Sequence, residues 1–529
     1  MKRLTALFCF LLLAFACSAA VGEVQVSVTP ENPRVGDYVD VTVIPDRENY
    51  QEIAYELLYD GEKSITYKPV NNGKDTKTHL TASFRPRQEC TCTLRVTVTY
   101  GRKDKETAEI TVPVSGFAPE QEGPDAVYSQ KDGWWYKKWY SKAHGRDLQK
   151  SACAIFTLSH ALQRMGYTGD SVKPETLGKA YSYFYRVGEG TSNSGLITKA
   201  AEDFDFVTQQ DLIHSAKELA ASLRRGDLFS FSIVDGHIAL GDGLSEDGTK
   251  VHIVDSAPGA TFERIRAKGS IFFRNADGTF TQADSPEDLP GMRWFFETHE
   301  YGGMEYWMDI DYCALHGMRL IRKHWLKADP GTGLTGVTVE YAGAMMTKVQ
   351  RGEESWRTAT RDLVLTGGEP HAPKIALVTA KKGTTLKDGT GKAVPKKKAI
   401  RQNAMVLVLD VQEDLYYAWW DNGFGYLVPA DVSLLDPAEG DFVTGVIAVN
   451  GSTSGTRTAA VHRNPKAKSD TIDTWKTGTP VAVVEKSGDF YLLEGKGVRG
   501  WVHQKYLILD QQESIEGSLE NGQKINEGE

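Results

Sequence analysis

The sequence has few cysteines and no large excess of charge of either sign. Only six of its 529 residues are cysteine, and its formal net charge is -9. Because Cys9 and Cys17 fall in an apolar run at the N-terminus, four cysteines remain, too few for a disulfide scaffold. The modest charge gives no indication of a nucleic-acid partner. No zinc-ligand spacing, phosphate-binding loop or nucleotide fingerprint occurs, so we expect no metal and no cofactor.

Long hydrophobic runs are also absent after the first twenty residues, so we expect no transmembrane span in the mature chain. The chain begins Met1-Lys2-Arg3, continues with a mostly apolar run, and then has the small residues Ser18-Ala19-Ala20. This order is typical of a secretory signal peptide, here 1–22. We therefore expect an exported protein that is periplasmic, at the cell surface or secreted. Cys17 leaves lipoprotein anchoring as an alternative, although the residues before it depart from the usual lipobox at two positions.

A chain of this length needs several hydrophobic cores, and its first part alternates polar and apolar residues. Short stretches such as YVDVTVIP and TCTLRVTVTY are separated by turn residues, which predicts an antiparallel β-sandwich over 23–115. The sandwich resembles an immunoglobulin-like domain without the usual distant cysteine pair and core tryptophan. Cys90 and Cys92 are two residues apart on one strand and point to the same face, where a disulfide would be strained. A packed or redox-labile pair is expected.

The region 126–330 has a mixed pattern of helices and strands. Apolar residues at helical spacing predict a helix over 153–165 that stops at Gly166. Further helices are expected at about 194–203 and 215–224. Strands are expected at 228–234, 237–244 and 251–255. The pattern of this region therefore predicts an α+β domain.

The C-terminal half contains two similar β-rich segments. After a weakly patterned joining segment, 331–373, the first segment covers 374–436 and ends GFGYLVPADVSLL, and the second covers 442–510 and ends GVRGWVHQKYLIL. The shared pattern of glycine, an aromatic residue, valine and a final apolar strand resembles the end of bacterial SH3-like domains. That resemblance implies two small β-barrels, each closed by its final strand. The acidic tail 511–529 is predicted to be disordered.

Cys153 is the candidate nucleophile of the central region. It lies where the helix 153–165 should begin, after a polar run that ends at Ser151. The N-terminus of a helix favours the thiolate, which is the reactive form of cysteine. A cysteine at a helix start is by itself more often a small buried apolar residue. The interpretation therefore depends on a base elsewhere in the chain.

His237 and Asp255 are the candidate base and its partner. His237 follows a glycine at the start of one expected strand, and Asp255 ends the next. A hairpin folded about position 246 or 247 places the two side chains on one face, directly opposite or one diagonal step apart. A carboxylate there could orient an imidazole whose other nitrogen meets a thiol. The structural alternative is a strand-capping histidine and a turn-forming aspartate before Pro258.

Together these segments resemble papain-like cysteine peptidases of the bacteriocin-processing, double-glycine-leader type. The resemblance covers roughly 142–264 and includes the Cys-led helix, a glycine-rich loop entering a second helix, and Gly236-His237-Ile238. It implies a nucleophile, Cys153, a general base, His237, an orienting residue, Asp255, and an oxyanion donor, Gln149. Three positions depart from the family pattern. Ala154 replaces the usual glycine, serine replaces proline after Asp255, and Gln149 lies four residues before the cysteine instead of about six.

The resulting hypothesis is an exported cysteine peptidase or amidase that cleaves a peptide or a peptidoglycan stem-peptide amide through an acyl-enzyme intermediate. SH3-like domains in such proteins suggest binding to peptidoglycan or to protein. An NlpC-type endopeptidase would show Asp-Cys-Ser-Gly at the nucleophile, and Ala152-Cys153-Ala154 does not fit. The alternative from another class is a non-catalytic wall-binding or surface protein with a degenerate peptidase domain.

Overall fold

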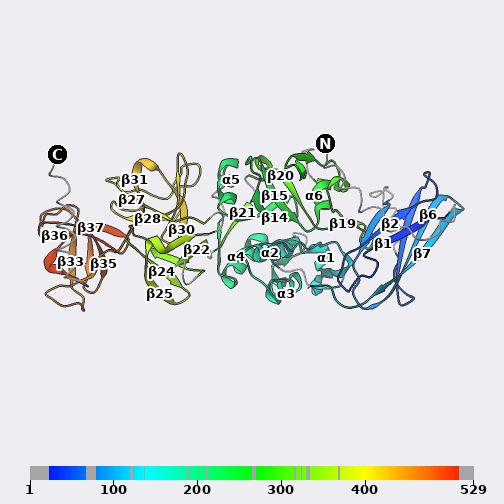
Figure 1. Cartoon of the computed structure of the whole chain (residues 1–529), viewed down its shortest axis with the longest axis horizontal. Coiled ribbons are helices and arrows are strands. Elements are labelled where there is room, and N and C mark those ends of the chain that lie inside the picture. The colour runs from blue at the N-terminus through cyan, green and yellow to red at the C-terminus, as the bar shows by residue number, and fades with distance from the viewer. Residues whose placement is uncertain are drawn as a thin grey trace, which may run out of the picture. The chain divides into compact units, whose positions relative to one another are not determined.

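The computed structural model of the chain is β-rich, multidomain and has few helices (Figure 1). It describes residues 23–66, 79–119, 123–135, 137–187, 190–209, 213–264, 270–314, 317–322, 325–328, 334–366 and 370–510. The predicted signal peptide 1–22 and the predicted disordered tail 511–529 lie outside the described residues. Within the described residues, no helix has both the length and the apolar character needed to cross a membrane.

The chain divides into two compact units, and each unit is built from three separate stretches of the sequence. The first unit contains 1–191, 234–237 and 254–306, and the second contains 192–233, 238–253 and 307–529. Cys153, His237 and Asp255 all belong to the first unit.

The first unit contains two sheets that share one core, formed mostly by the region 23–115 for which a β-sandwich was predicted. Its two sheets are, in spatial order, β1 (Gln25–Thr29), β2 (Val39–Ile44), β5 (Thr81–Phe84), β18 (Trp294–Phe295) and β19 (Glu300–Tyr301), and then β4 (Glu62–Thr66), β3 (Glu52–Tyr59), β6 (Cys90–Gly101) and β7 (Asp104–Val114). The inward residues of both sheets form one core, as Val41 of β2 and Val96 of β6 illustrate. The period-two alternation that predicted these strands is the alternation between this core and solvent.

Two strands of the sandwich come from far along the chain. β18 pairs in parallel with β5, with Phe295 opposite Ser83, and it lies in the region 126–330 that was assigned to the central domain. Trp294 and Phe296 enter the sandwich core, where the ring of Phe296 stacks on Tyr55 at a centroid distance of 5.2 Å. The segment 23–115 has no tryptophan. Trp294 therefore supplies the core tryptophan that the N-terminal segment lacks.

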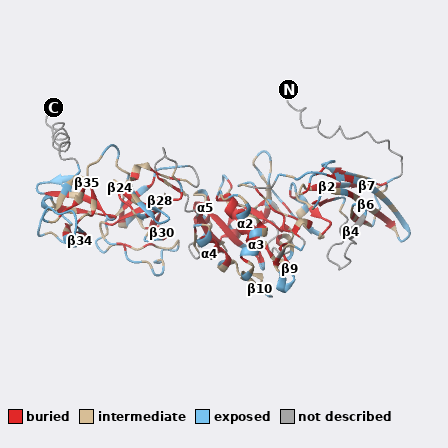
Figure 2. Cartoon of the chain, turned by 90° about the horizontal axis from the view of Figure 1, so that it is seen from below, coloured by how far each residue is buried: buried red, intermediate tan, exposed pale blue. Residues whose placement is uncertain are grey.

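The helices of the first unit are α1 (Leu148–Ser151), α2 (Cys153–Arg164), α3 (Pro174–Ala180) and α6 (Pro258–Arg264). The predicted helix 153–165 is confirmed as α2, which is buried along almost its whole length (Figure 2). Gly166 has φ +89°, a left-handed conformation that ends the helix. Because α2 is so thoroughly buried, packing on every side fixes the position of its first residue, Cys153.

The helices of the second unit are α4 (Asn193–Asp203), α5 (Ala216–Arg224) and α7 (Ile310–Cys313). α4 and α5 confirm the predicted helices 194–203 and 215–224 to within one residue. The side chain of Ser215 accepts a hydrogen bond from the backbone N–H of Glu218, which caps the start of α5.

An eight-stranded sheet carries the predicted central strands. Its order is β12 (Phe206–Gln209), β21 (Gly317–Arg322), β13 (Leu228–Val234), β14 (His237–Leu244), β15 (Lys250–Asp255), β20 (Met304–Asp309), β16 (Ile271–Arg274) and β17 (Phe280–Gln282). β13, β14 and β15 match the three predicted strands to within one residue. Between β13 and β14, Gly236 has φ +75°, a conformation that favours glycine and makes the tight turn before His237.

The joining segment 331–373 is more structured than its sequence suggested. It contains β23 (Thr338–Tyr341), β24 (Met346–Arg351), β25 (Glu354–Ala359) and β26 (Leu363–Leu365), of which β26 pairs with β22 (Leu326–Ala328). Two of its buried inward positions are threonines, Thr347 and Thr360, whose hydroxyls lie 2.8 Å apart in a hydrogen bond. Because polar residues occupy buried positions, the apolar periodicity that marks a strand is weak here.

The two C-terminal β-rich segments each fold into a sheet whose last strand pairs with its first. The earlier sheet has the order β30 (Gly423–Leu427), β29 (Tyr416–Trp420), β28 (Met405–Val411), β27 (Lys374–Val378) and β31 (Val432–Leu435). The later sheet has the order β34 (Thr471–Lys476), β33 (Thr458–His462), β37 (Val498–His503), β36 (Phe490–Gly495), β35 (Pro480–Ser487), β32 (Thr444–Ile447) and β38 (Leu507–Leu509). Ile375 pairs with Leu435, and Gly445 pairs with Leu509, so each final strand returns to the first as expected.

Candidate active site

Cys153 is the first residue of α2, and its side chain is half-buried. The preceding residue, Ala152, separates α2 from the short helix α1 and is fully buried. The thiol therefore lies at a helix N-terminus, where unpaired backbone N–H groups and the helix dipole favour a negative charge. Cys153 is therefore less enclosed than the residues that follow it in α2, all of which are buried.

The structure brings His237 and Asp255 together. Nε2 of His237 lies 2.7 Å from Oδ1 of Asp255, and both side chains are buried. His237 is the first residue of β14 and Asp255 is the last of β15, so the pair forms across the open end of one hairpin. Since Nε2 is used by Asp255, Nδ1 is the ring nitrogen left for a thiol.

Asp255 accepts three further hydrogen bonds. Its Oδ1 also accepts the backbone N–H of Ala257 at 2.8 Å. Its Oδ2 accepts the hydroxyls of Thr261 at 2.6 Å and of Tyr306 at 2.8 Å. Both hydroxyl-bearing residues are buried. The carboxylate is therefore held in a fixed orientation by donors on both oxygens.

These contacts shift the protonation of the pair toward the charged forms. Burial by itself would raise the pKa of Asp255, but the charge of His237 and the hydrogen bonds from His237, Thr261 and the Ala257 backbone lower it below the usual value. Burial would likewise lower the pKa of His237, but the charge of Asp255 and hydrogen bonds with Asp255 and Cys153 raise it to about 10. The hydrogen bond with Cys153 places the thiol beside the imidazole, so all three predicted residues lie in one contact network.

Tyr140 lies near Cys153 and contacts Thr191, and no sequence pattern marked either of them as a site residue. The hydroxyls of Tyr140 and Thr191 lie 2.9 Å apart, and Thr191 also reaches the carbonyl oxygen of Ser151 at 3.5 Å. Burial raises the pKa of Tyr140 to about 12; the hydrogen bond with Thr191 lowers it and the neighbouring charge of Cys153 raises it. These partly buried hydroxyls connect the glycine-rich loop to the residues just before Cys153.

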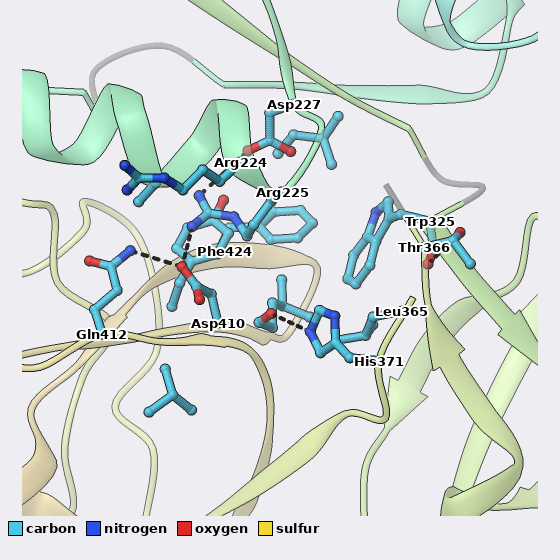
Figure 3. A pocket seen from close by; sticks show the side chains of 15 residues that line it. Arg224, Arg225, Asp227, Trp325, Leu365, Thr366, His371, Asp410, Gln412 and Phe424 are labelled. Carbon is cyan, nitrogen blue, oxygen red and sulfur yellow. Dashed lines mark hydrogen bonds and ion pairs between the residues drawn. The ribbon is translucent and has the colours of Figure 1, made fainter. Parts of the chain in front are cut away.

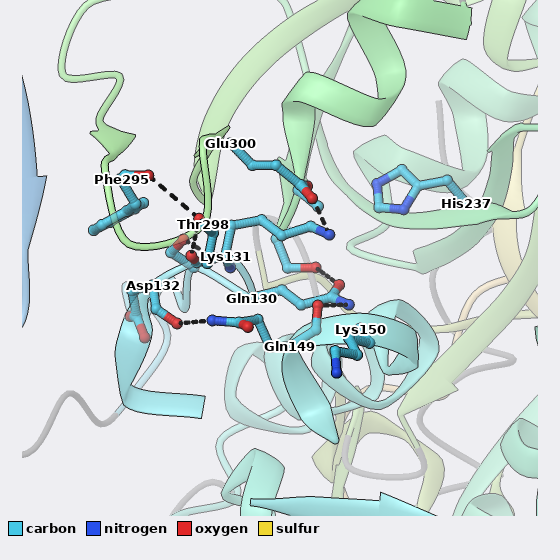
Figure 4. A network of polar contacts seen from close by, with 12 residues as sticks. Gln130, Lys131, Asp132, Gln149, Lys150, His237, Phe295, Thr298 and Glu300 are labelled. Carbon is cyan, nitrogen blue, oxygen red and sulfur yellow. Dashed lines mark hydrogen bonds and ion pairs between the residues drawn. The ribbon is translucent and has the colours of Figure 1, made fainter. Parts of the chain in front are cut away.

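Gln149 lies in a network of amide groups beside the nucleophile helix (Figure 4). Its side-chain Nε2 donates to the backbone carbonyl oxygen of Asp132 at 2.9 Å, and its backbone carbonyl oxygen accepts Nε2 of Gln130 at 3.1 Å. Gln130 in turn donates its backbone N–H to the carbonyl oxygen of Ser256 at 2.8 Å, next to Asp255. Gln130 therefore links the segment before Cys153 to the segment after Asp255.

Asp147 occupies the position six residues before Cys153, where the resembled family usually has its oxyanion glutamine. Its carboxylate accepts the backbone N–H groups of Lys150 and Lys137, both at 3.1 Å. Since Asp147 is buried and caps the start of α1, its contacts are structural. Gln149 is thus the glutamine side chain nearest in sequence to the nucleophile.

Other histidines take part in separate contacts. His160 is buried, accepts the backbone N–H of Tyr128 at 2.9 Å and stacks on the Tyr128 ring. His252 pairs with Asp242 at 2.6 Å on the same hairpin as His237. Among the described residues, no group of three or more histidine, cysteine or acidic side chains is arranged to hold a metal ion.

Cys90 and Cys92 lie side by side with their sulfurs 3.3 Å apart, in a hydrogen-bonding contact and not in a disulfide. Burial is the largest cause of the raised pKa of both thiols, so both favour the protonated form. Burial also raises the pKa of Cys313. No histidine is among the groups that shift the pKa of these three thiols, whereas Cys153 contacts the imidazole of His237.

Comparison with known proteins identifies one part of the chain. Residues 457–508 match the family model for the bacterial SH3 domain, so the chain contains a bacterial SH3 domain within the later of the two predicted SH3-like segments. The SH3-like assignment of the earlier segment, 374–436, stays a prediction. No curated protein matches the sequence.

Two solved structures share a limited likeness with the chain. NlpC2 from Trichomonas vaginalis is 10% identical, with 26% of this chain and 47% of that chain covered and a TM-score of 0.11. NlpC1 from the same organism is 11% identical, with 26% and 45% covered and a TM-score of 0.11. The match therefore spans less than half of either structure. A likeness this distant carries no argument about fold or activity.

Proposed function

We propose that the chain is an exported cysteine peptidase or amidase that cleaves a peptide or a cell-wall peptide amide. The catalytic domain would be papain-like and lie within 126–330, with Cys153 as nucleophile, His237 as general base and then acid, and Asp255 as the orienting residue. The observation that carries the proposal is the contact network of Cys153, His237 and buried Asp255, in which Nε2 and Oδ1 are 2.7 Å apart. A nucleophile, a base within reach and a third group that orients the base form the arrangement needed for acyl transfer.

The proposed reaction begins with proton transfer from the thiol of Cys153 to Nδ1 of His237. The thiolate sulfur attacks the amide carbon, and the carbonyl oxygen becomes an oxyanion. Collapse of this tetrahedral intermediate breaks the C–N bond as the imidazolium gives its proton to the leaving amine, which leaves an acyl-enzyme. His237 then takes a proton from water, and the resulting hydroxide attacks the thioester. Collapse of this second tetrahedral intermediate breaks the C–S bond and releases the acid, and the imidazolium returns its proton to the sulfur.

The oxyanion would be stabilised by the backbone N–H of Cys153 and by the side-chain amide of Gln149. Nε2 of Gln149 donates one hydrogen to the carbonyl oxygen of Asp132, and an amide nitrogen carries two hydrogens. We propose that the second hydrogen serves the oxyanion. The contact with Asp132 would hold the side-chain amide for that role, and Gln130 holds the backbone of Gln149 through its carbonyl oxygen.

The remaining parts of the proposal concern localisation and targeting. The bacterial SH3 domain at 457–508, with an SH3-like partner over 374–436, supports binding to peptidoglycan or to protein. The N-terminal sequence supports export through a signal peptide. We assign the N-terminal sandwich an immunoglobulin-like topology and no catalytic role. A peptidoglycan stem peptide is the substrate that unites these features.

The test is the pH dependence of iodoacetamide alkylation at Cys153, followed by mass spectrometry of the peptide that contains it. Wild type should label rapidly below neutral pH, because a thiolate paired with an imidazolium persists there. His237→Ala should abolish that acidic reactivity. His252→Ala is the matched control, since it removes the imidazole of a second His–Asp pair from the same hairpin.

The other cysteines act as internal controls in the same experiment. Cys92 and Cys313 are buried with raised pKa values and should stay unlabelled at acidic pH. If Cys153 labels like an ordinary thiol in wild type and in His237→Ala, the peptidase proposal is wrong. The alternative, a non-catalytic wall-binding protein with a degenerate peptidase domain, would then be favoured.

A further inference from the structure

A cavity of about 450 Å³ lies within the second unit, remote in sequence from Cys153 (Figure 3). Its walls come from the end of α5, from the residues around β22 and β26, and from β28 to β30. Such a volume falls within the range of small-ligand sites, about 300–1,000 Å³. The cavity is thus large enough for a ligand of a few residues.

One side of the cavity is apolar and aromatic. The rings of Trp325 and Phe424 lie with centroids 6.1 Å apart and tilted by 52°, and Leu365 and Leu409 line the same cavity. Aromatic rings gain contact energy from a further apolar or aromatic group placed against them. This side therefore suits an apolar side chain.

The two acidic residues of the cavity are already neutralised. Nη1 of Arg225 contacts Oδ2 of Asp410 at 2.9 Å, and its Nη2 lies 3.5 Å from Oδ2 of Asp227. The Arg225 guanidinium also lies 3.9 Å from the centre of the Tyr417 ring. The charge of Arg225 is therefore balanced by Asp410 and Asp227, and this side chain offers no unpaired positive charge to a ligand.

Arg224 supplies the unbalanced charge. It lines the cavity, is exposed, and has no hydrogen bond or ion pair with any residue in the described part of the chain. In Figure 3 its guanidinium lies toward the same end of the cavity as Gln412, while Trp325 lies at the other end. Nε2 of Gln412 is bonded to Asp410 at 3.0 Å, which leaves its amide oxygen to accept a hydrogen bond.

We propose that this cavity binds the C-terminal end of a short peptide, with the carboxylate on Arg224 and an apolar side chain against Trp325 and Phe424. A guanidinium can bind a carboxylate through two parallel hydrogen bonds, which favours a free carboxylate over a neutral amide. The oxygen of Gln412 would accept a peptide N–H. The site depends on none of the residues assigned to catalysis, so it can exist whether or not Cys153 is active.

The experiment measures binding to the full mature chain carrying Cys153→Ala, so that no peptide is cleaved. The probes are acetyl-Phe-Ala with a free carboxylate and the same dipeptide with a C-terminal carboxamide, followed by isothermal titration calorimetry. We expect the amide to bind about ten- to a hundredfold more weakly than the acid, as the loss of a charged hydrogen bond implies. Arg224→Gln should weaken the acid by a similar factor and leave the amide unchanged.

Two variants complete the test. Trp325→Ala should weaken both probes, because both use the apolar side. Arg457→Gln is the matched control, since it removes the same charge from an exposed arginine in the bacterial SH3 domain and should change neither dissociation constant. The proposal is overturned if the acid and the amide bind equally to the Cys153→Ala protein with an unchanged cavity, or if neither probe binds at millimolar concentration. It is also overturned if Arg224→Gln leaves the preference for the acid intact.

Discussion

Replacing Asp255 with asparagine should lower the pKa of His237 and the acidic reactivity of Cys153. The side chains have the same shape, and the hydroxyls of Thr261 and Tyr306 can rotate to accept hydrogen bonds from the new amide. The fold should therefore survive. What disappears is the negative charge 2.7 Å from Nε2 of His237.

The size of the effect follows from the protonation of the pair. A rise in the pKa of His237 from 6.5 to about 10 corresponds to roughly 5 kcal/mol of preference for the charged ring. A hydrogen bond to a charged partner contributes about 1.5–3 kcal/mol, and each 1.36 kcal/mol moves a pKa by about one unit. Asp255→Asn should thus lower the pKa of His237 by about one to two units, which makes proton transfer from Cys153 less favourable and slows alkylation at pH 6 by at most about ten- to a hundredfold.

The assay is ¹⁵N NMR of labelled histidine over a pH titration, together with the alkylation rate at pH 6. Asp242→Asn is the matched control, because it removes the carboxylate of the neighbouring His252 pair. The reasoning is refuted if His237 in Asp255→Asn still titrates near pH 10 and Cys153 labels at the wild-type rate. Asp255 would then not be the source of the raised pKa.

Three further predictions concern pH, the glycine turn and oxyanion stabilisation. The pKa of His237 is raised to about 10 and that of Asp255 is lowered, so the stabilisation from the pair should be complete between about pH 4 and 6.5. This stabilisation should be lost as the pH rises toward 10. Thermal unfolding of wild type and of Asp255→Asn at several pH values measures the difference. Gly236→Ala should lower the free energy of unfolding by about 1–2 kcal/mol, because φ is +75°, and Gly236→Asn should cost less. Gln149→Ala should lower kcat by about a hundredfold without changing the alkylation rate of Cys153. An unchanged kcat would show that Gln149 only stabilises the position of α1.

The central elements could be predicted from the sequence because their signals are local. The apolar periodicity of α2 and the turn at Gly236 lie within short windows, and the pairing of His237 with Asp255 needs only one hairpin. Eighteen residues separate the two side chains. Over such a distance the alternation of a strand decides which residues share a face.

The partners of Asp255 could not be predicted in the same way. Tyr306 lies 51 residues further along the chain, and nothing in its own segment marks it as a donor to a carboxylate. Trp294 likewise joins a sandwich that begins about 270 residues earlier, and its contribution is visible only once β18 pairs with β5. Long-range partners of this kind leave no periodic trace in the sequence.

The burial of His237 and Asp255 bears on the choice between a catalytic and a structural role. Replacing a buried ion pair by well-packed apolar residues is often neutral or stabilising by about 1–4 kcal/mol, so stability alone gives little reason for a fold to keep such a pair. Here the pair is enclosed with three additional donors, while Cys153 beside it is half-buried. Core packing needs neither feature, whereas acyl transfer needs both a charge held out of water and a sulfur that a substrate can reach. This combination favours the peptidase over a degenerate domain.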